Sequence, residues 1–168
     1  MPLLLKSPWD DIVHPLILII EDSDEDFYAL LRTIQQSEML QQGLSLYRFL
    51  RFQDGDEALD YLLREGEYQT LTAPLPSFIL LDLNLPGTDG REIIQRVKNS
   101  SSMALNTLPI VVLTTSNSPR DIQTCYCYGA NTYLLKPMGV SEMRQTVQIL
   151  FQYWFQLAVL PRDGELTT

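Results

Sequence analysis

Short runs of consecutive apolar residues recur along this chain, and each is followed by a segment whose apolar positions have helical spacing. The clearest runs lie at residues 16–20, 78–81 and 109–113. Runs of this length that are apolar on both faces are typical of the inner strands of a parallel sheet. They are far shorter than the roughly 18 residues that a membrane-spanning helix needs. We therefore expect the chain to fold around a buried parallel sheet.

Two further strands and five helices complete the predicted pattern. The strands lie at 44–52, which is a mixed apolar and basic segment, and at 132–135. A helical segment follows every strand, and the five helices begin near Ser23, Asp54, Gly90, Ser118 and Ser141. This alternation predicts an α/β fold, the flavodoxin-like (βα)5 three-layer sandwich with a parallel five-stranded sheet in the order 2-1-3-4-5.

The length of 168 residues suits one domain with a substantial core. We expect that domain to span residues 14–158, after an N-terminal extension at 1–13 and before a C-terminal tail at 159–168. The extension has no helical or strand periodicity and contains Pro2. One folded unit with two short flanking segments is the predicted organisation.

The composition limits the partners that this protein can have. A formal net charge of −9 disfavours nucleic-acid binding, because contacts to phosphates need clustered lysines and arginines. The two cysteines, Cys125 and Cys127, are too few for a disulfide framework or a metal quartet. The sequence contains no apolar segment long enough for a leader or a membrane span. We therefore expect a cytoplasmic protein.

Acid, hydroxyl and amine side chains follow directly on four of the predicted strands. Glu21 and Asp22 follow the first strand, and the third, fourth and fifth strands deliver Asp82, Thr114 and Lys136. In a doubly wound sheet, ligands bind beyond the carboxyl ends of the strands, at the switch point between the first and third. Clustered carboxylates repel one another until a hard divalent cation binds, and Mg²⁺ suits a site with few protein oxygens. Carboxylates, Mg²⁺ and anion-binding groups in one crevice indicate phosphoryl transfer onto a carboxylate.

Some of these residues also have a plainer interpretation. Glu21 and Asp22 belong to a run of five acids in six residues, and acids are common at helix N-termini because they suit the helix dipole. Asp82 and Lys136 are harder to explain in this way, since a charge beside a buried apolar run is rarely left without a partner. The combination of residues, more than any single one, indicates a functional site.

Four motifs, in matching order and spacing, resemble the receiver domain of two-component response regulators. They are Glu21-Asp22, the stretch from Leu80 to Pro86 with Asp89-Gly90, Leu113-Thr114, and Leu135-Lys136-Pro137. The resemblance covers roughly residues 14–158 and leaves no room for an output domain. It implies a stand-alone signalling protein that is not an enzyme in its own right. Its only reactions are then self-catalysed phosphotransfer and autodephosphorylation.

The resemblance also implies a role for each matching residue. Asp82 is the expected phosphoacceptor, which takes its phosphoryl group from a sensor histidine kinase. Glu21 and Asp22 are expected to hold Mg²⁺ together with Asp82 and the backbone carbonyl of Asn84. These assignments fit the acidic cluster that the strand ends predict.

The resemblance further implies which residues bind the phosphoryl group and which residue changes conformation in response. Lys136 and Thr114 are expected to bind phosphoryl oxygens. Tyr133 occupies the aromatic switch position and is expected to turn inward as Thr114 moves toward the phosphate. The face formed by the fourth helix, fifth strand and fifth helix would then change. Thr115 stands where the family more often has alanine or glycine, and we expect it to slow the loss of phosphate.

Three alternative functions use a related scaffold. A Mg²⁺-dependent phosphohydrolase or nuclease usually has a second acid two residues beyond the first, and here that position is Asn84. A flavodoxin-like cofactor carrier needs a phosphate-binding loop after the first strand, where this chain has acids that repel phosphate. A receiver-like binding module without phosphotransfer is the third, although all five signature side chains are present.

A finer resemblance points to the kinase. Residues 64–68, residues 89–92 and the aromatic C-terminus are similar to the small response regulators that partner cyanobacterial phytochromes. In that group the kinase is a bilin-binding light sensor, and the regulators form dimers through the last strand and helix. The sequence does not identify the downstream protein.

The final helix has more apolar surface than one core requires. Its inner stripe is expected to comprise Met143, Val147, Leu150, Phe151, Trp154, Leu157 and Ala158. Ile149, Tyr153 and Phe155 widen the apolar arc to roughly 240°. A second copy of the chain is the expected cover, which predicts a homodimer. The alternative is that residues 159–160 and the N-terminal segment fold back over this surface.

Overall fold

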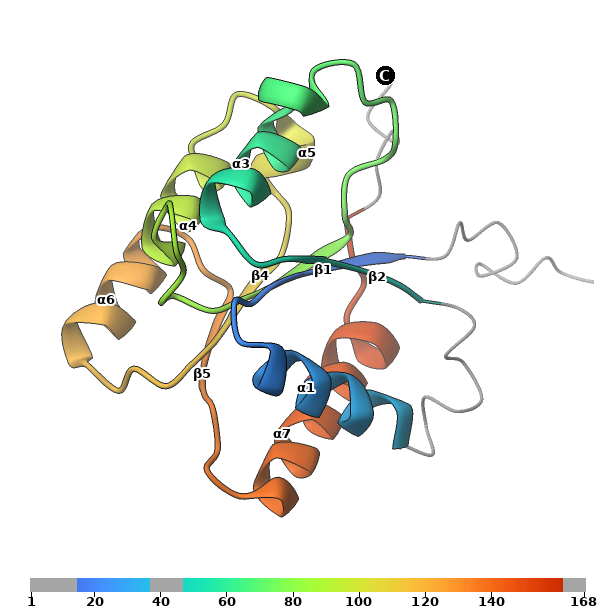
Figure 1. Ribbon diagram of the computed structural model, residues 1–168, viewed down its shortest axis with the longest axis vertical. Helices are drawn as coiled ribbons and strands as arrows, with labels where there is room; N and C mark the ends of the chain where they lie inside the picture. The colour runs from blue at the N-terminus through green and yellow to red at the C-terminus, as the bar shows by residue number, and fades with distance from the viewer. Residues whose placement is uncertain (1–14, 37–46, 162–168) are drawn as a thin grey trace, which may run out of the picture.

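A five-stranded parallel sheet forms the centre of the molecule (Figure 1). The computed structural model describes residues 15–36 and 47–161. The strands are β1 (Leu16–Ile20), β2 (Arg48–Phe52), β3 (Phe78–Leu81), β4 (Ile110–Thr114) and β5 (Thr132–Leu135), in the order β2-β1-β3-β4-β5. Each neighbouring pair is parallel. The predicted fold class and strand order are confirmed.

Helices cover both faces of this sheet (Figure 1). On one face lie α1 (Asp24–Gln36) and α7 (Val140–Gln152), which contact each other. The opposite face carries α3 (Gly55–Leu63), α4 (Gly90–Lys98) and α6 (Pro119–Cys127). Two short elements, η2 (Gly66–Tyr68) and α5 (Met103–Asn106), were not predicted, because one turn is too short to show a period.

The sheet separates two apolar cores. Along β1, Leu18 and Ile20 point into the core beneath α3, α4 and α6, while Ile17 and Ile19 point into the core beneath α1 and α7. Successive strand residues point to opposite faces, so an apolar run fills both cores at once. All four of these side chains are at most 1% exposed.

The serines that precede two of the helices cap their N-termini, as the sequence indicates. The hydroxyl of Ser23 accepts a hydrogen bond from the Asp26 amide, and Ser118 does the same for Asp121. The last helix begins one residue before its predicted start, at Val140. Residues 1–14, 44–46 and 162–168 of the predicted segments, including the predicted first residue of the domain, lie outside the described residues.

The end of the last helix departs from the prediction. Residues Tyr153–Leu157 form a π-helix, in which the Ala158 amide donates to the Tyr153 carbonyl at 2.7 Å. Each residue of a π turn advances by a smaller angle than in an α turn, so side chains beyond it shift to another face. Phe155 consequently turns inward onto Phe78, and Leu157, expected inside, is 77% exposed. The expected placement of Phe155 on the outer face is therefore wrong.

In the described ranges, 15–36 and 47–161, no helix has the length and apolar character needed to cross a membrane.

Candidate functional site

Three carboxylates meet at the carboxyl ends of β1 and β3. Glu21 and Asp22 follow β1, and Asp82 follows β3, which is the neighbouring strand. One oxygen from each lies within 4.8 Å of the others. Glu21 and Asp82 are buried, whereas Asp22 is exposed. The predicted acidic cluster therefore exists, and part of it is withdrawn from water.

The ammonium group of Lys136 lies at the centre of this cluster. Its Nζ donates to Asp82 Oδ2 at 2.7 Å and pairs with Glu21 Oε2 at 2.8 Å. A third carboxylate oxygen, Oδ2 of Asp26, lies 2.7 Å away. An ammonium has three hydrogens, so all three are directed at carboxylates. The Lys136 side chain is only 7% exposed.

Sequence reasoning did not identify Asp26 as part of the site. It is the acid three residues after the N-cap Ser23, and so lies in the first turn of α1, just beyond β1. Helix capping alone accounts for an acid at this position, although the position also brings the carboxylate to the predicted edge of the sheet.

Burial and neighbouring charges act on these groups in opposite directions. Burial raises the pKa of Glu21, and the charge of Asp82 raises it further, while Lys136 lowers it. Burial lowers the pKa of Lys136, but hydrogen bonds to three carboxylates outweigh burial and leave this pKa above its ordinary value. The lysine thus stays charged, and the cluster keeps an excess of negative charge that a divalent cation would neutralise.

The local backbone fixes the orientation of Asp82. Its Oδ1 accepts hydrogen bonds from the amides of Leu83 at 2.6 Å and Asn84 at 3.4 Å, while Oδ2 faces Lys136. The loop then packs so closely on α4 that a Cβ on Gly90 would lie 2.5 Å from the Asp82 carbonyl oxygen. Glycine at position 90 therefore permits the close approach of α4 to this loop.

Thr114 and Tyr133 are connected through Ser116. The hydroxyl of Thr114, at the buried end of β4, accepts a hydrogen bond from the Ser116 amide at 3.4 Å. The Tyr133 hydroxyl donates to the Ser116 carbonyl at 2.9 Å. Thr114 and Tyr133, the two residues of the predicted switch, therefore both contact the loop between β4 and α6.

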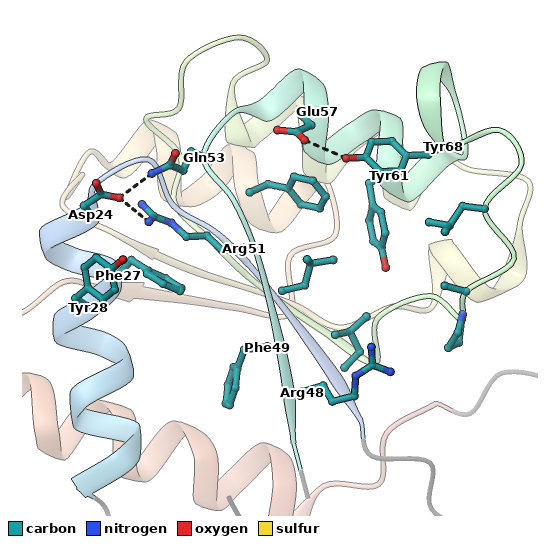
Figure 2. A pocket seen from close by; sticks show the side chains of 16 residues that line it. Asp24, Phe27, Tyr28, Arg48, Phe49, Arg51, Gln53, Glu57, Tyr61 and Tyr68 are labelled. Carbon is teal, nitrogen blue, oxygen red and sulfur yellow. Dashed lines mark hydrogen bonds and ion pairs between the residues drawn. The ribbon is translucent and has the colours of Figure 1, made fainter. Parts of the chain in front are cut away.

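An open pocket of about 900 Å³ lies along β2, the edge strand (Figure 2). Aromatic side chains from both faces of the sheet line it, among them Phe27, Phe49 and Tyr68. Figure 2 also shows Asp24, which accepts from Arg51 Nη1 at 2.6 Å and from Gln53 Nε2 at 2.7 Å. The pocket lining includes none of the three clustered carboxylates.

A family model described as the response regulator receiver domain matches residues 17–148. The chain belongs to this family. Response regulator Rcp1 of Synechocystis sp. is 35% identical over 146 residues, which cover 87% of this chain and 92% of Rcp1. The crystal structure of the phosphorylated cyanobacterial phytochrome response regulator RcpA matches with a TM-score of 0.76 at 35% identity, over 89% of this chain and 99% of RcpA. The Mn²⁺-bound form of Rcp1 matches with a TM-score of 0.76 at 32% identity, over 88% of this chain and 99% of Rcp1.

Membership of this family identifies the chain as a response regulator, a signalling protein of two-component systems. It also agrees with the position of the acidic cluster, which lies at the switch point where a doubly wound sheet binds its ligand.

Proposed function

We propose that Asp82 accepts a phosphoryl group from the phosphohistidine of a sensor kinase. The P–N bond of the donor breaks as a P–O bond forms to a carboxylate oxygen of Asp82, and the donor imidazole leaves. The observation that carries this proposal is the direct contact of Lys136 with Asp82, at 2.7 Å, beside two further acids. A phosphohydrolase or nuclease is not favoured, because Asn84 occupies the position of its second acid.

We propose that Glu21, Asp22 and Asp82, with the backbone carbonyl of Asn84, hold Mg²⁺. Hard oxygen ligands and an excess of negative charge suit this ion. When bound, it neutralises charge on the carboxylates and on the transferred phosphoryl group. A Mn²⁺-bound form of the relative Rcp1 has been solved, which supports a divalent cation as the ligand.

We propose that Lys136 and Thr114 bind the phosphoryl oxygens and that Tyr133 reports their movement. Lys136 is already directed at Asp82, so it is placed to donate to a group attached there. Movement of the Thr114 hydroxyl toward the phosphate would release the Ser116 amide. Because Tyr133 donates to the Ser116 carbonyl, the loop and the aromatic ring would move together. The output is a changed surface on α6, β5 and α7, which a downstream protein binds.

We propose a phytochrome-type histidine kinase as the phosphodonor and a cytoplasmic location for the regulator. The support is the similarity to Rcp1 and to the phytochrome response regulator RcpA over most of both chains.

We propose residues 14–158 as the extent of the receiver domain. The packing of Phe155 on Phe78 supports a boundary beyond the end of the family match at residue 148.

The proposed function is tested by transfer from a radiolabelled, autophosphorylated phytochrome kinase. Label should move to the wild-type chain in Mg²⁺, and should move neither in EDTA nor to Asp82→Asn. A non-phytochrome histidine kinase serves as the specificity control. Transfer to Asp82→Asn at the wild-type rate would contradict the assignment of the phosphoacceptor.

We propose a homodimer that pairs the outer surfaces of β5 and α7. Ile149 is 57% exposed, Tyr153 54% and Leu135 47%, so an apolar surface runs from the edge strand along the helix. Leu157 joins this surface in place of Phe155, which is partly buried against the core beneath α1 and α7. Sedimentation velocity should give a dimer for wild type and a monomer for Ile149→Glu. A wild-type monomer would indicate that another part of the chain covers the surface.

A further inference from the structure

We propose that Arg51 is a positioning residue that holds the loop carrying Glu21 and Asp22 in the arrangement that binds the divalent cation. This inference rests on the proposed function of those acids. Arg51 lies on β2, outside the acidic cluster, in the segment whose basic residues the predicted function leaves unexplained. Its side chain is nevertheless only 14% exposed.

The guanidinium of Arg51 contacts two residues of the loop between β1 and α1 and the first residue of α1. Its Nε donates to the carbonyl of Glu21 at 2.9 Å, and its Nη2 donates to the carbonyl of Asp22 at 3.2 Å. Its Nη1 pairs with Asp24 at 2.6 Å, as Figure 2 shows. The backbone of both proposed metal ligands is therefore attached to the neighbouring strand through one side chain.

Neighbouring groups keep the guanidinium itself in place. Its carbon lies 4.3 Å from the centre of the Phe27 ring, a cation–π contact that restricts the plane of the fork. Gln53 donates to the same oxygen of Asp24 that Arg51 contacts. A lysine has no planar fork, so it would not reproduce the paired contacts to two carbonyls.

These contacts affect metal binding because residues of β2 bond both the backbone amide and the backbone carbonyl of Glu21. The Glu21 amide donates to the carbonyl of Phe52 at 3.0 Å, and its carbonyl accepts from Arg51. The Glu21 carboxylate meanwhile accepts from the Ser23 amide at 3.1 Å. Fixing the peptide fixes the direction from which the side chain reaches the cluster. Groups that orient metal ligands commonly change metal affinity by 10- to 100-fold when they are removed.

The test is the affinity of the full chain for Mn²⁺, measured from the loss of the free-ion signal in electron paramagnetic resonance. We expect Arg51→Met to weaken Mn²⁺ binding about tenfold. Arg51→Lys should also weaken it, because the charge remains but the fork is lost. Arg48→Met is the matched control: it lies on the same strand with an exposed side chain, and it should keep the wild-type affinity. Circular dichroism checks that each variant is folded.

The direction in which Mn²⁺ affinity changes in Arg51→Met distinguishes a positioning role from a purely electrostatic effect. Removal of a nearby positive charge, by itself, strengthens the binding of a cation. Tighter or unchanged Mn²⁺ binding by folded Arg51→Met would therefore overturn the role of Arg51 alone. Hydrogen exchange supplies a second readout, in which the amides of Asp22 and Ser23 should exchange faster in Arg51→Met than in Arg48→Met. Failure of the wild-type chain to bind Mn²⁺ would overturn the proposed metal site, and this inference with it.

Discussion

Replacement of Lys136 by methionine should destabilise the metal-free protein, and Mg²⁺ should restore part of the loss. The substitution keeps most of the side-chain volume but removes an ammonium that contacts Asp82, Glu21 and Asp26 at 2.7, 2.8 and 2.7 Å. Asp26 is 41% exposed, so water can replace the lysine there. Glu21 and Asp82 are both 8% exposed, and each would be left as a buried charge without its cation.

Removal of one partner from a buried ion pair costs about 3–5 kcal/mol. Protonation of a buried carboxylate limits this cost, so we expect a loss of about 3 kcal/mol near neutral pH. For a domain of this size, that corresponds to a decrease of about 6–12 °C in the midpoint of thermal unfolding. Bound Mg²⁺ supplies positive charge to the same carboxylates, so the deficit should shrink in its presence.

The pH dependence of the stability of Lys136→Met follows from the direction in which the pKa of Glu21 is shifted. Burial already raises the pKa of Glu21, and loss of Lys136 removes a group that lowers it. The folded variant would then bind more protons than the unfolded chain between the ordinary value of 4.5 and the raised one. Stability of the variant therefore falls as the pH rises through that interval. The deficit against wild type should be smaller at about pH 5 than at about pH 7.

Urea unfolding of wild type and Lys136→Met, in EDTA and in Mg²⁺, measures the free energies directly. Lys98→Met is the matched control, because Lys98 is a half-buried lysine that donates to the carbonyl of Leu108 at 2.6 Å. The loss of stability in Lys98→Met should be the same in EDTA and in Mg²⁺. The argument fails if Lys136→Met has wild-type stability in EDTA. It also fails if Mg²⁺ changes the deficits of the two variants equally.

Three further predictions concern other parts of the structure. Burial raises the pKa of Cys125 to about 11, so at about pH 8 a thiol reagent should label only exposed Cys127 in the native protein; rapid labelling of both would contradict this. Phe155→Ala should lower the free energy of unfolding by about 3 kcal/mol in urea, and Ile149→Ala by less than about 0.5 kcal/mol in the monomer; equal losses would refute the inward placement of Phe155. Thr115→Gly should shorten the half-life of the acyl phosphate, as followed by intact mass, and an unchanged half-life would refute shielding by Thr115.

The fold and the main acids could be predicted because they follow from short-range patterns. The apolar run at β1 specifies a buried strand, and the acids Glu21 and Asp22 follow it directly. Parallel strands end at the same edge of a sheet, so Asp82 and Lys136 had to lie near these acids once the strand order was known. The alternation of five strands with five helices suits the order 2-1-3-4-5, the family resemblance agrees with it, and the structure confirms it.

Contacts that depend on side-chain packing could not be predicted. Arg51 appears in the sequence as one basic residue in a mixed strand, and only the structure shows its contacts to two loop carbonyls. Acids such as Asp26 are common in the first turn of a helix without any role in a site, and only the structure shows its contact with Lys136. The π-helix at Tyr153 has no sequence period of its own, so regular α-helical spacing placed Phe155 on the wrong face.

Intact mass spectrometry after incubation with acetyl phosphate tests the central claim most directly, because it needs no kinase. With Mg²⁺ present, the account predicts that wild type gains the mass of one phosphoryl group. It predicts no gain for wild type in EDTA or for Asp82→Asn in Mg²⁺. A gain of the same mass by Asp82→Asn would place the phosphoryl group on another residue and contradict the account.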